Sequence, residues 1–128
     1  MRNHRVVAAA LLALAAGSVG PSRSVSAHSF PKQTHPAAGS TVNSPPSEVA
    51  IEFDSPVRAL SVKLQVLDST GVDETAGATV VSKDHHCVSA PLKLLKPGEF
   101  TVKWKVMAQD GHGSEGSFSF MVAGENGS

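Results

Sequence analysis

The feature that most constrains the fold is a two-residue alternation of apolar and polar side chains that recurs after residue 27. Four runs show it: EVAIEFD (48–54), SVKLQVLD (61–68), EFTVKWKVMA (99–108) and GSFSFMV (116–122). In the third run Phe100, Val102 and Trp104 alternate with polar residues. Because successive side chains of a strand point to opposite faces of a sheet, this period predicts half-buried antiparallel strands.

Turn-forming sequences separate these runs, namely NSPPS (43–47), DSTG (68–71), KPGE (96–99) and DGHGSEG (110–116). Two weaker runs, ATVVS (78–82) and VSAPLKLL (88–95), are expected to add strands. Short strands separated by turns at intervals of roughly ten residues are typical of an all-β, Ig-like sandwich or Greek-key barrel. We expect Trp104 and the five phenylalanines in its core, and interpret Trp104 as a core residue rather than a ligand platform.

An apolar leader precedes the strands. Arg2 and Arg5 are followed by VVAAALLALAA (6–16), and the small residues VSA (25–27) form a cleavage site, which together are typical of a secretory signal peptide. The apolar run is shorter than the roughly 20 residues that span a bilayer. We therefore expect residues 1–27 to be removed on export. Residues 28–128 would then form one domain with no stable membrane insertion after cleavage.

The net charge and the single cysteine limit which partners and which kinds of stabilisation are expected. The chain has 11 basic and 11 acidic residues, and the leader holds three of the arginines and no acid, so residues 28–128 carry a net charge of −3. Nucleic-acid binding needs a basic surface, so no nucleic-acid partner is expected. Cys87 is the one cysteine and cannot form an internal disulfide, so the domain depends on its hydrophobic core.

Cleavage after Ala27 would make His28 the first residue, with a free α-amine. The amine and the ring Nδ1 of one residue can chelate a single metal ion, and nitrogen-rich tetragonal sites suit Cu(II) or Ni(II). Before cleavage the same nitrogen is an amide and offers no such chelate. His28 is therefore a candidate metal ligand.

A second candidate lies in QDGHG (109–113), directly after a predicted strand. Asp110 and His112 are two residues apart, and such residues share a face in an extended chain, so a carboxylate and an imidazole can converge on one ion. The alternative is a polar loop with an ordinary Asp-Gly turn. The spacing by itself leaves both interpretations open.

Three longer segments carry a family resemblance: HPAAGSTVNSPPSEVAIEF (35–53), FDSPV (53–57) and PLKLLKPGEFTVKWKVMAQDGHGSEGSFSFMV (91–122). With a mature start at His28, they make the chain similar to the CopC family of periplasmic copper-binding proteins. The resemblance implies a seven-stranded Greek-key β-barrel and a periplasmic location. It also implies a Cu(II) site formed by His28 (amine and ring), Asp110 and His112, and delivery of copper to a CopD-like inner-membrane protein.

The sequence departs from the family pattern in two places. Ser55 stands where family members often have a glutamate that can approach the metal, and the neighbouring Asp54 is a candidate substitute. Gly113 stands where a proline commonly follows the loop histidine, which leaves the loop more conformational freedom to lose. His35 lies in a shared segment and is interpreted as structural or solvent-exposed rather than as a ligand.

The stretch DHHC (84–87) has no counterpart in that pattern. Thiolate and imidazole together suit Cu(I) or Zn, so His85, His86 and Cys87 are candidates for a second, softer Cu(I) site. The alternative is an exposed loop with a partly buried Cys87. A methionine-rich Cu(I) site is not expected, because only Met107 and Met121 follow the leader.

The leading functional interpretation is a binding protein and not an enzyme: a periplasmic Cu(II) carrier or buffer in copper homeostasis and resistance. The first alternative is an N-terminal-histidine copper oxidoreductase. Enzymes that cleave polysaccharides in this way need a broad surface with exposed aromatics, whereas this chain has no tyrosine. The second alternative is a non-metal Ig-like interaction domain, which a mature start elsewhere than His28 would favour.

Overall fold

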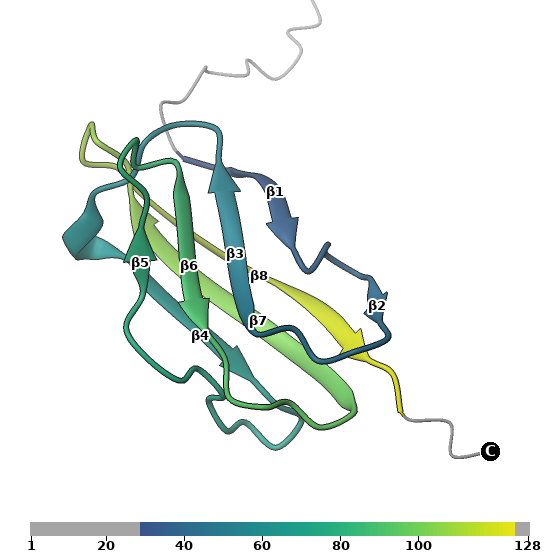
Figure 1. The fold of residues 1–128 in the computed structure, drawn as a ribbon. Coiled ribbons are helices and arrows are strands. Elements are labelled where there is room, and N and C mark those ends of the chain that lie inside the picture. Colours follow the sequence, from purple (N-terminus) through teal and green to yellow (C-terminus); the bar gives the residue numbers. More distant parts are fainter. Residues whose placement is uncertain (1–28, 125–128) are drawn as a thin grey trace, which may run out of the picture.

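The structure, a computed structural model, describes residues 29–124 and is built from strands. The predicted signal peptide (1–27) and His28 lie outside the described residues. The described part contains β1 (Pro31–His35), β2 (Thr41–Val42), β3 (Glu48–Phe53), β4 (Lys63–Leu67), β5 (Val80–Val81), β6 (Cys87–Pro91), β7 (Gly98–Met107) and β8 (Gly113–Val122) (Figure 1). A single 3-10 turn, η1 (Ala59–Ser61), precedes β4.

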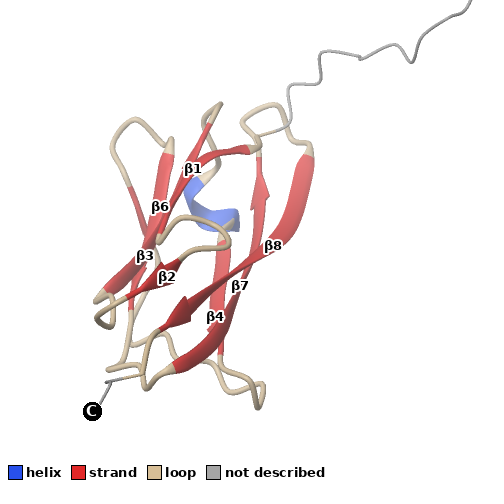
Figure 2. Cartoon of the chain, turned by 90° about the vertical axis from the view of Figure 1, so that its right-hand side faces the viewer, coloured by secondary structure: helices blue, strands red, loops and turns tan. Residues whose placement is uncertain are grey.

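The strands form two four-stranded sheets, with the orders β1-β3-β6-β5 and β2-β8-β7-β4. All neighbours are antiparallel except β2, which runs parallel to β8. Figure 2 shows the two sheets stacked with their inner faces toward one another. The all-β sandwich predicted from the alternation is therefore confirmed.

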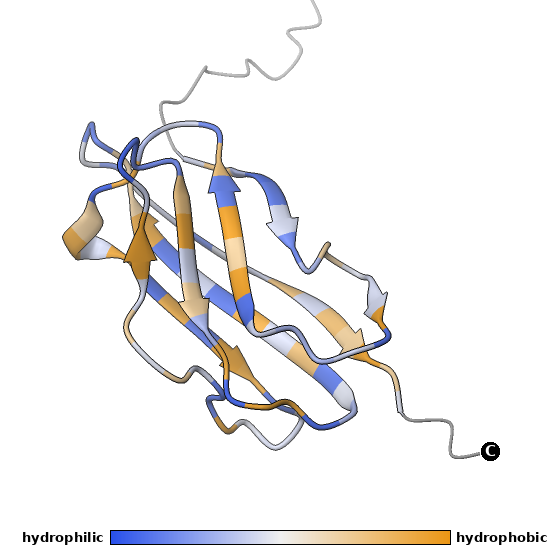
Figure 3. Ribbon diagram, in the orientation of Figure 1, coloured by the Kyte–Doolittle hydropathy of each residue, from blue (hydrophilic) through white to orange (hydrophobic). Residues whose placement is uncertain are grey.

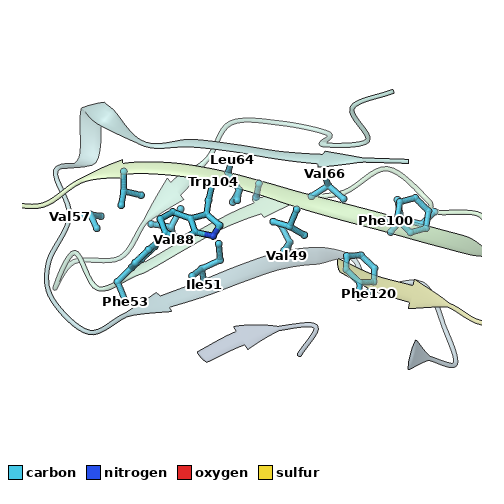
Figure 4. Close-up of a cluster of buried hydrophobic side chains, with 14 of the residues drawn as sticks. Val49, Ile51, Phe53, Val57, Leu64, Val66, Val88, Phe100, Trp104 and Phe120 are labelled. Carbon is cyan, nitrogen blue, oxygen red and sulfur yellow. The ribbon is translucent and has the colours of Figure 1, made fainter. Parts of the chain in front are cut away.

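The core fills the space between the sheets (Figure 4). Most apolar members of the alternating runs are buried, as Val49, Ile51 and Phe53 of β3 illustrate, and the hydropathy colours alternate along β3 and β7 (Figure 3). Each such side chain contributes roughly 1.5–3 kcal/mol by leaving water. Trp104 is 8% exposed and meets Phe53 edge-to-face with ring centroids 5.3 Å apart, which confirms its core role.

Not every aromatic residue lies in this core. Phe53, Phe100 and Phe120 are buried, and Phe118 packs against the core from a partly buried position. Phe30 is 49% exposed, so the expectation that all five phenylalanines are core residues is wrong. The physical reason is that Phe30 lies just before β1, an edge strand whose residues are mostly exposed.

Strand boundaries differ from the prediction at several points. β1 and β2 were not predicted, because short edge strands with exposed residues show no alternation. The run 61–68 begins as a strand only at Lys63, after η1, and the run 88–95 ends as a strand at Pro91. The fold thus has one more strand in the described region than the seven expected.

Four segments far apart in sequence meet at one end of the sandwich (Figure 1). They are the start of the described chain at Ser29, the loop after β3, the turn between β5 and β6, and the loop between β7 and β8. Within residues 29–124 no helix is long and apolar enough to cross a membrane. The candidate ligands Asp110 and His112 belong to the last of these four segments.

Candidate metal centre

The N-terminal segment is fixed to this end of the sandwich through Ser29, whose side chain is completely buried. Its hydroxyl lies 3.1 Å from the carbonyl of Ser55, 3.0 Å from the Ser55 hydroxyl and 3.2 Å from the carbonyl of Pro56. The Ser29 carbonyl in turn accepts a 2.7 Å hydrogen bond from the hydroxyl of Ser114 in β8. The residue that follows His28 is therefore held from two directions.

Asp54, the candidate substitute ligand, binds the same segment. Its Oδ1 accepts a hydrogen bond from the backbone N–H of Phe30 at 2.9 Å, and its own N–H donates to the Phe30 carbonyl at 2.9 Å. The hydroxyl of Ser55 also donates to Oδ1, at 3.4 Å. The Asp54 carboxylate thus lies near the N-terminal segment, and its Oδ1 is engaged in holding the start of β1.

The loop between β7 and β8 is a tight turn built by its own backbone. The N–H of Ala108 donates to the carbonyl of His112 at 2.8 Å, and the N–H of Gly111 donates to the carbonyl of Ala108 at 2.9 Å. Gly111 has a φ of +94°, in the left-handed region that favours glycine. This turn brings Asp110 and His112 to the tip of the hairpin, next to one another.

Asp110 and His112 form a paired unit. The carboxylate Oδ1 of Asp110 accepts the backbone N–H of His112 at 3.0 Å, and Oδ2 lies 3.1 Å from the ring Nδ1. In the neutral ring, donation from Nδ1–H to the carboxylate places the metal-binding lone pair on Nε2. Carboxylates commonly orient metal-binding histidines in this way. The His112 side chain is 64% exposed, so an ion can reach it.

One carbonyl joins this loop to the N-terminal segment. The Pro56 carbonyl accepts hydrogen bonds from both the Ser29 hydroxyl, at 3.2 Å, and the N–H of Gln109, at 3.3 Å. The Gln109 side chain donates to the neighbouring Val57 carbonyl at 3.2 Å. Pro56 and Val57 therefore position the loop and the chain start relative to one another.

Within residues 29–124, no three His, Cys, Asp or Glu side chains gather as a metal site. Asp110 and His112 supply two donors, and the third predicted ligand, His28, lies outside the described residues. His35 is exposed on β1, which is one of the two placements expected for it.

The DHHC stretch forms the turn between β5 and β6 and the start of β6. His85 has a φ of +62°, and its Nδ1 lies 3.0 Å from the Val57 carbonyl, whereas Nδ1 of His86 lies 3.0 Å from the Asp84 carbonyl. Cys87 is half-buried and faces Glu52 across the β3–β6 pair. The two rings are thus held by different carbonyls.

The environment of Cys87 disfavours its thiolate form. Burial raises the pKa of the Cys87 thiol above its usual value, and the negative charges of Glu52, Asp84 and Glu48 raise it further. A soft metal ion would have to displace the thiol proton against this shift.

The serines that build this end of the fold were not predicted from the sequence. Ser55 was noted only as a departure from a family pattern, and nothing in the pattern pointed to Ser29 or Ser114 as its partners. Serines have no periodic signal of their own. Their pairing depends on the sandwich topology, which brings residues 26 to 85 positions apart into contact.

The comparison with known proteins decides the family. The CopC domain profile matches residues 31–123. This chain belongs to the CopC family. It is 30% identical over 115 residues to protein YobA of Escherichia coli K12, with 88% of this chain and 91% of YobA covered.

Another relative of this CopC-family chain is the copper transport protein CutJ of Bacillus subtilis strain 168. It is 29% identical over 103 residues, which make up 79% of this chain but only 19% of CutJ. The chain thus matches about a fifth of that relative's length.

Solved structures agree with this assignment. The crystal structure of CopC from Methylosinus trichosporium OB3b matches with a TM-score of 0.72 and 29% identity, covering 79% of this chain and 99% of that one. PcoC, a methionine-rich copper resistance protein from E. coli, matches in fold with a TM-score of 0.66 and 19% identity, over 74% of this chain and 98% of PcoC. The predicted family and fold are confirmed.

Proposed function

We propose that residues 1–27 are a signal peptide and that the exported protein, starting at His28, binds Cu(II) through His28, Asp110 and His112. In this proposal the protein is a periplasmic carrier or buffer that serves copper homeostasis and resistance. The family assignment and the copper-related names of its relatives support the choice of metal. The copper ion is the cargo of the protein.

The observation that carries the proposal is the 2.7 Å hydrogen bond from the Ser114 hydroxyl to the Ser29 carbonyl. His28 is bonded directly to Ser29, and consecutive Cα atoms lie about 3.8 Å apart. His112 precedes Ser114 by two residues. The residue next to His28 is thus held at the end of the sandwich that carries the Asp110–His112 pair, which supports the proposed site.

The donor set fits the chemistry of Cu(II). The amine and ring of His28 would supply two nitrogens, and Nε2 of His112 would supply a third in a tetragonal plane. The amine has an ordinary pKa near 8, so copper competes with a proton that is easily displaced near neutral pH. Asp110 would either bind the ion or orient His112, as its contact with Nδ1 at 3.1 Å allows.

The surface of the described residues favours a copper carrier over an oxidoreductase that acts on a polymer. Four of the six aromatic side chains, Phe53, Phe100, Trp104 and Phe120, are buried in the core, so they form no platform for a polymeric substrate. The exposed His112 would allow copper to pass to a partner, for which a CopD-like inner-membrane protein is proposed. An oxygen-consumption assay with copper and a reductant tests this choice, since peroxide production above that of free copper would favour the enzyme.

Replacing the loop histidine tests the site. We expect His112→Asn to weaken Cu(II) binding at least tenfold in a competition titration, and the matched variant His35→Asn, on the exposed face of β1, to leave it unchanged. Equal affinity in His112→Asn and the unmodified protein would contradict the proposed ligand set. Mass spectrometry of the exported protein tests the start at His28 separately.

A second Cu(I) site at His85, His86 and Cys87 stays a prediction. Both rings contact backbone carbonyls through Nδ1, so each would bind the ion through Nε2. Cu(I) stoichiometry that is unchanged in Cys87→Ala would remove Cys87 from the site.

A further inference from the structure

The outer face of the β2-β8-β7-β4 sheet carries a cluster of lysines. Lys63 of β4 lies directly across from Lys105 of β7, and Lys103 lies two residues further along β7, facing Gln65. All three lysines are exposed. Hydrophilic segments alternate with hydrophobic ones along β7 in Figure 3.

These three lysines outnumber the one acid that lines the same hollow, Glu115. Among the described residues none of the three forms an ion pair, although Glu115 of β8 faces Lys105 across the strand pair. Like charges directly opposite one another destabilise a sheet, so the Lys63–Lys105 pair costs folding stability. An external anion would offset this cost.

The same face offers neutral hydrogen-bond donors. The three lysines line one shallow hollow together with Gln65, Ser117 and one acid, Glu115, so the charged groups of the hollow sum to a positive charge. Amide N–H and hydroxyl groups donate to phosphate oxygens, and a lysine ammonium binds phosphate as a compact point charge. The hollow therefore suits a phosphate group.

Arg58 extends the positive charge to the end of β7. Its backbone N–H donates to the Met107 carbonyl at 2.8 Å, and its Nη2 donates to the Gln109 carbonyl at 3.1 Å. Between Arg58 and Lys63 the chain forms η1, in which Leu60 is completely exposed. We call Arg58, Leu60, Lys63, Lys103 and Lys105 the basic face.

We propose that the basic face docks reversibly onto a membrane surface of anionic phospholipids, with Leu60 entering the headgroup region. A sheet face with three exposed lysines around a shallow hollow, and a fully exposed leucine in the turn that precedes β4, match the features of interfacial membrane binding. An acidic protein partner would account for the charges but would not require the exposed Leu60.

The charge distribution also sets an orientation. Residues 28–128 carry a net charge of −3, so the protein as a whole is repelled by an anionic surface. On the opposite sheet, Glu48 and Glu52 of β3 alternate outward. Docking through the basic face would turn these two acids away from the membrane. Because Arg58 contacts Gln109, the same docking would hold the Asp110–His112 loop close to the bilayer.

Vesicle binding tests this docking surface. The protein that starts at His28 contains the whole described sandwich and is mixed with phosphatidylglycerol-containing vesicles or with pure phosphatidylcholine vesicles. We expect binding to the anionic vesicles alone, and loss of binding at 1 M salt, where the screening length falls from about 10 Å (at 0.1 M) to about 3 Å.

Two triple variants that lose the same number of charges show which lysines bind the vesicles. Each lysine near an anionic surface contributes about a fivefold gain in partitioning, so Lys63→Gln/Lys103→Gln/Lys105→Gln should bind on the order of a hundredfold more weakly. The control is the triple variant Lys83→Gln/Lys93→Gln/Lys96→Gln, which removes three positive charges outside the basic face. Its affinity for the vesicles should lie within a few-fold of that of the unmodified protein. Circular dichroism verifies that both variants are folded.

Several outcomes would overturn the proposal: no binding to anionic vesicles, equal binding to neutral vesicles, or equal losses in the two triple variants. Binding to polyglutamate without binding to vesicles would assign the basic face to an acidic protein instead. Cu(II) affinity, measured on the same samples, is expected to be unchanged, so this test is independent of the proposed copper site.

Discussion

The side-chain hydroxyl of Ser114 donates a 2.7 Å hydrogen bond to the backbone carbonyl of Ser29, 85 residues earlier in the chain. Because Ser29 is completely buried, this contact fixes the beginning of the domain against the start of β8. It links the residue after His28 to the strand that follows His112. Copper binding at the proposed site depends on this link between the chain start and the β7–β8 hairpin.

Removing the Ser114 hydroxyl should loosen this link. We expect Ser114→Ala to lower the free energy of unfolding by about 1–2 kcal/mol, since the Ser29 carbonyl loses a partner in a part-buried position. Cu(II) binding should weaken several-fold because the chain start is held less firmly. Ser117→Ala, an exposed position on the same strand, is the control, and urea unfolding is the measurement. Equal stability of the two variants would contradict this role.

Neutralising Asp110 should weaken copper binding. In Asp110→Asn the side chain keeps its size but loses the charge that holds Nδ1 of His112 at 3.1 Å. Loss of a group that orients a metal-binding histidine typically costs 10–100-fold in affinity, and we expect a loss in this range for Cu(II). Glu115→Gln makes the same chemical change on nearby β8. An Asp110→Asn protein with unchanged affinity would exclude Asp110 from both proposed roles.

Gly116 lies directly across from Trp104, and its missing side chain leaves room for the indole. A Cβ at this position would lie 2.7 Å from Cζ2 and 3.0 Å from Cε2 of the ring, closer than atoms pack. We therefore expect Gly116→Ala to destabilise the fold by about 1–3 kcal/mol. Gly113→Ala, whose Cβ would have no neighbour closer than 3.8 Å, should be nearly neutral in thermal unfolding. A neutral Gly116→Ala would show that the indole can move aside.

Asp68 should make folding stability depend on acid pH. Hydrogen bonds from the Thr70 hydroxyl and the Val72 N–H lower the pKa of Asp68 from 3.8 to about 2. Because the folded-state pKa is the lower one, this contribution is fully present above about pH 4 and is lost as the pH falls toward 2. Urea unfolding from pH 5 to 2 should show a flatter profile for Asp68→Asn. Parallel profiles would contradict the shift.

Side-chain periodicity predicted the sandwich because most of its strands have one face in a dry core. The runs around Phe53 and Trp104 alternate for this reason, and both residues are buried. The same logic failed for β1 and β2, which lie at sheet edges, and for Phe30 beside them. The described residues of β1 and β2 are exposed or partly buried, so these short strands lack the buried alternate positions that produce the pattern.

The candidate site was predictable only in part. The spacing of Asp110 and His112 follows from the chemistry of a metal ligand pair, and the tight turn around Gly111 brings the two side chains together. The serine contacts that position the N-terminal segment were not predictable, because they join residues through the topology of the sheets rather than through local sequence. The role of Asp54 in binding the Phe30 N–H was missed for the same reason.

The central claim concerns the free amine of His28 and its convergence with the Asp110–His112 pair. The most direct measurement is electron paramagnetic resonance of the Cu(II)-loaded protein that starts at His28, beside a form with one extra residue before it. We expect a nitrogen-rich tetragonal spectrum for the first form, and its loss with much weaker binding in the second. Identical spectra and affinities in the two forms would contradict the account.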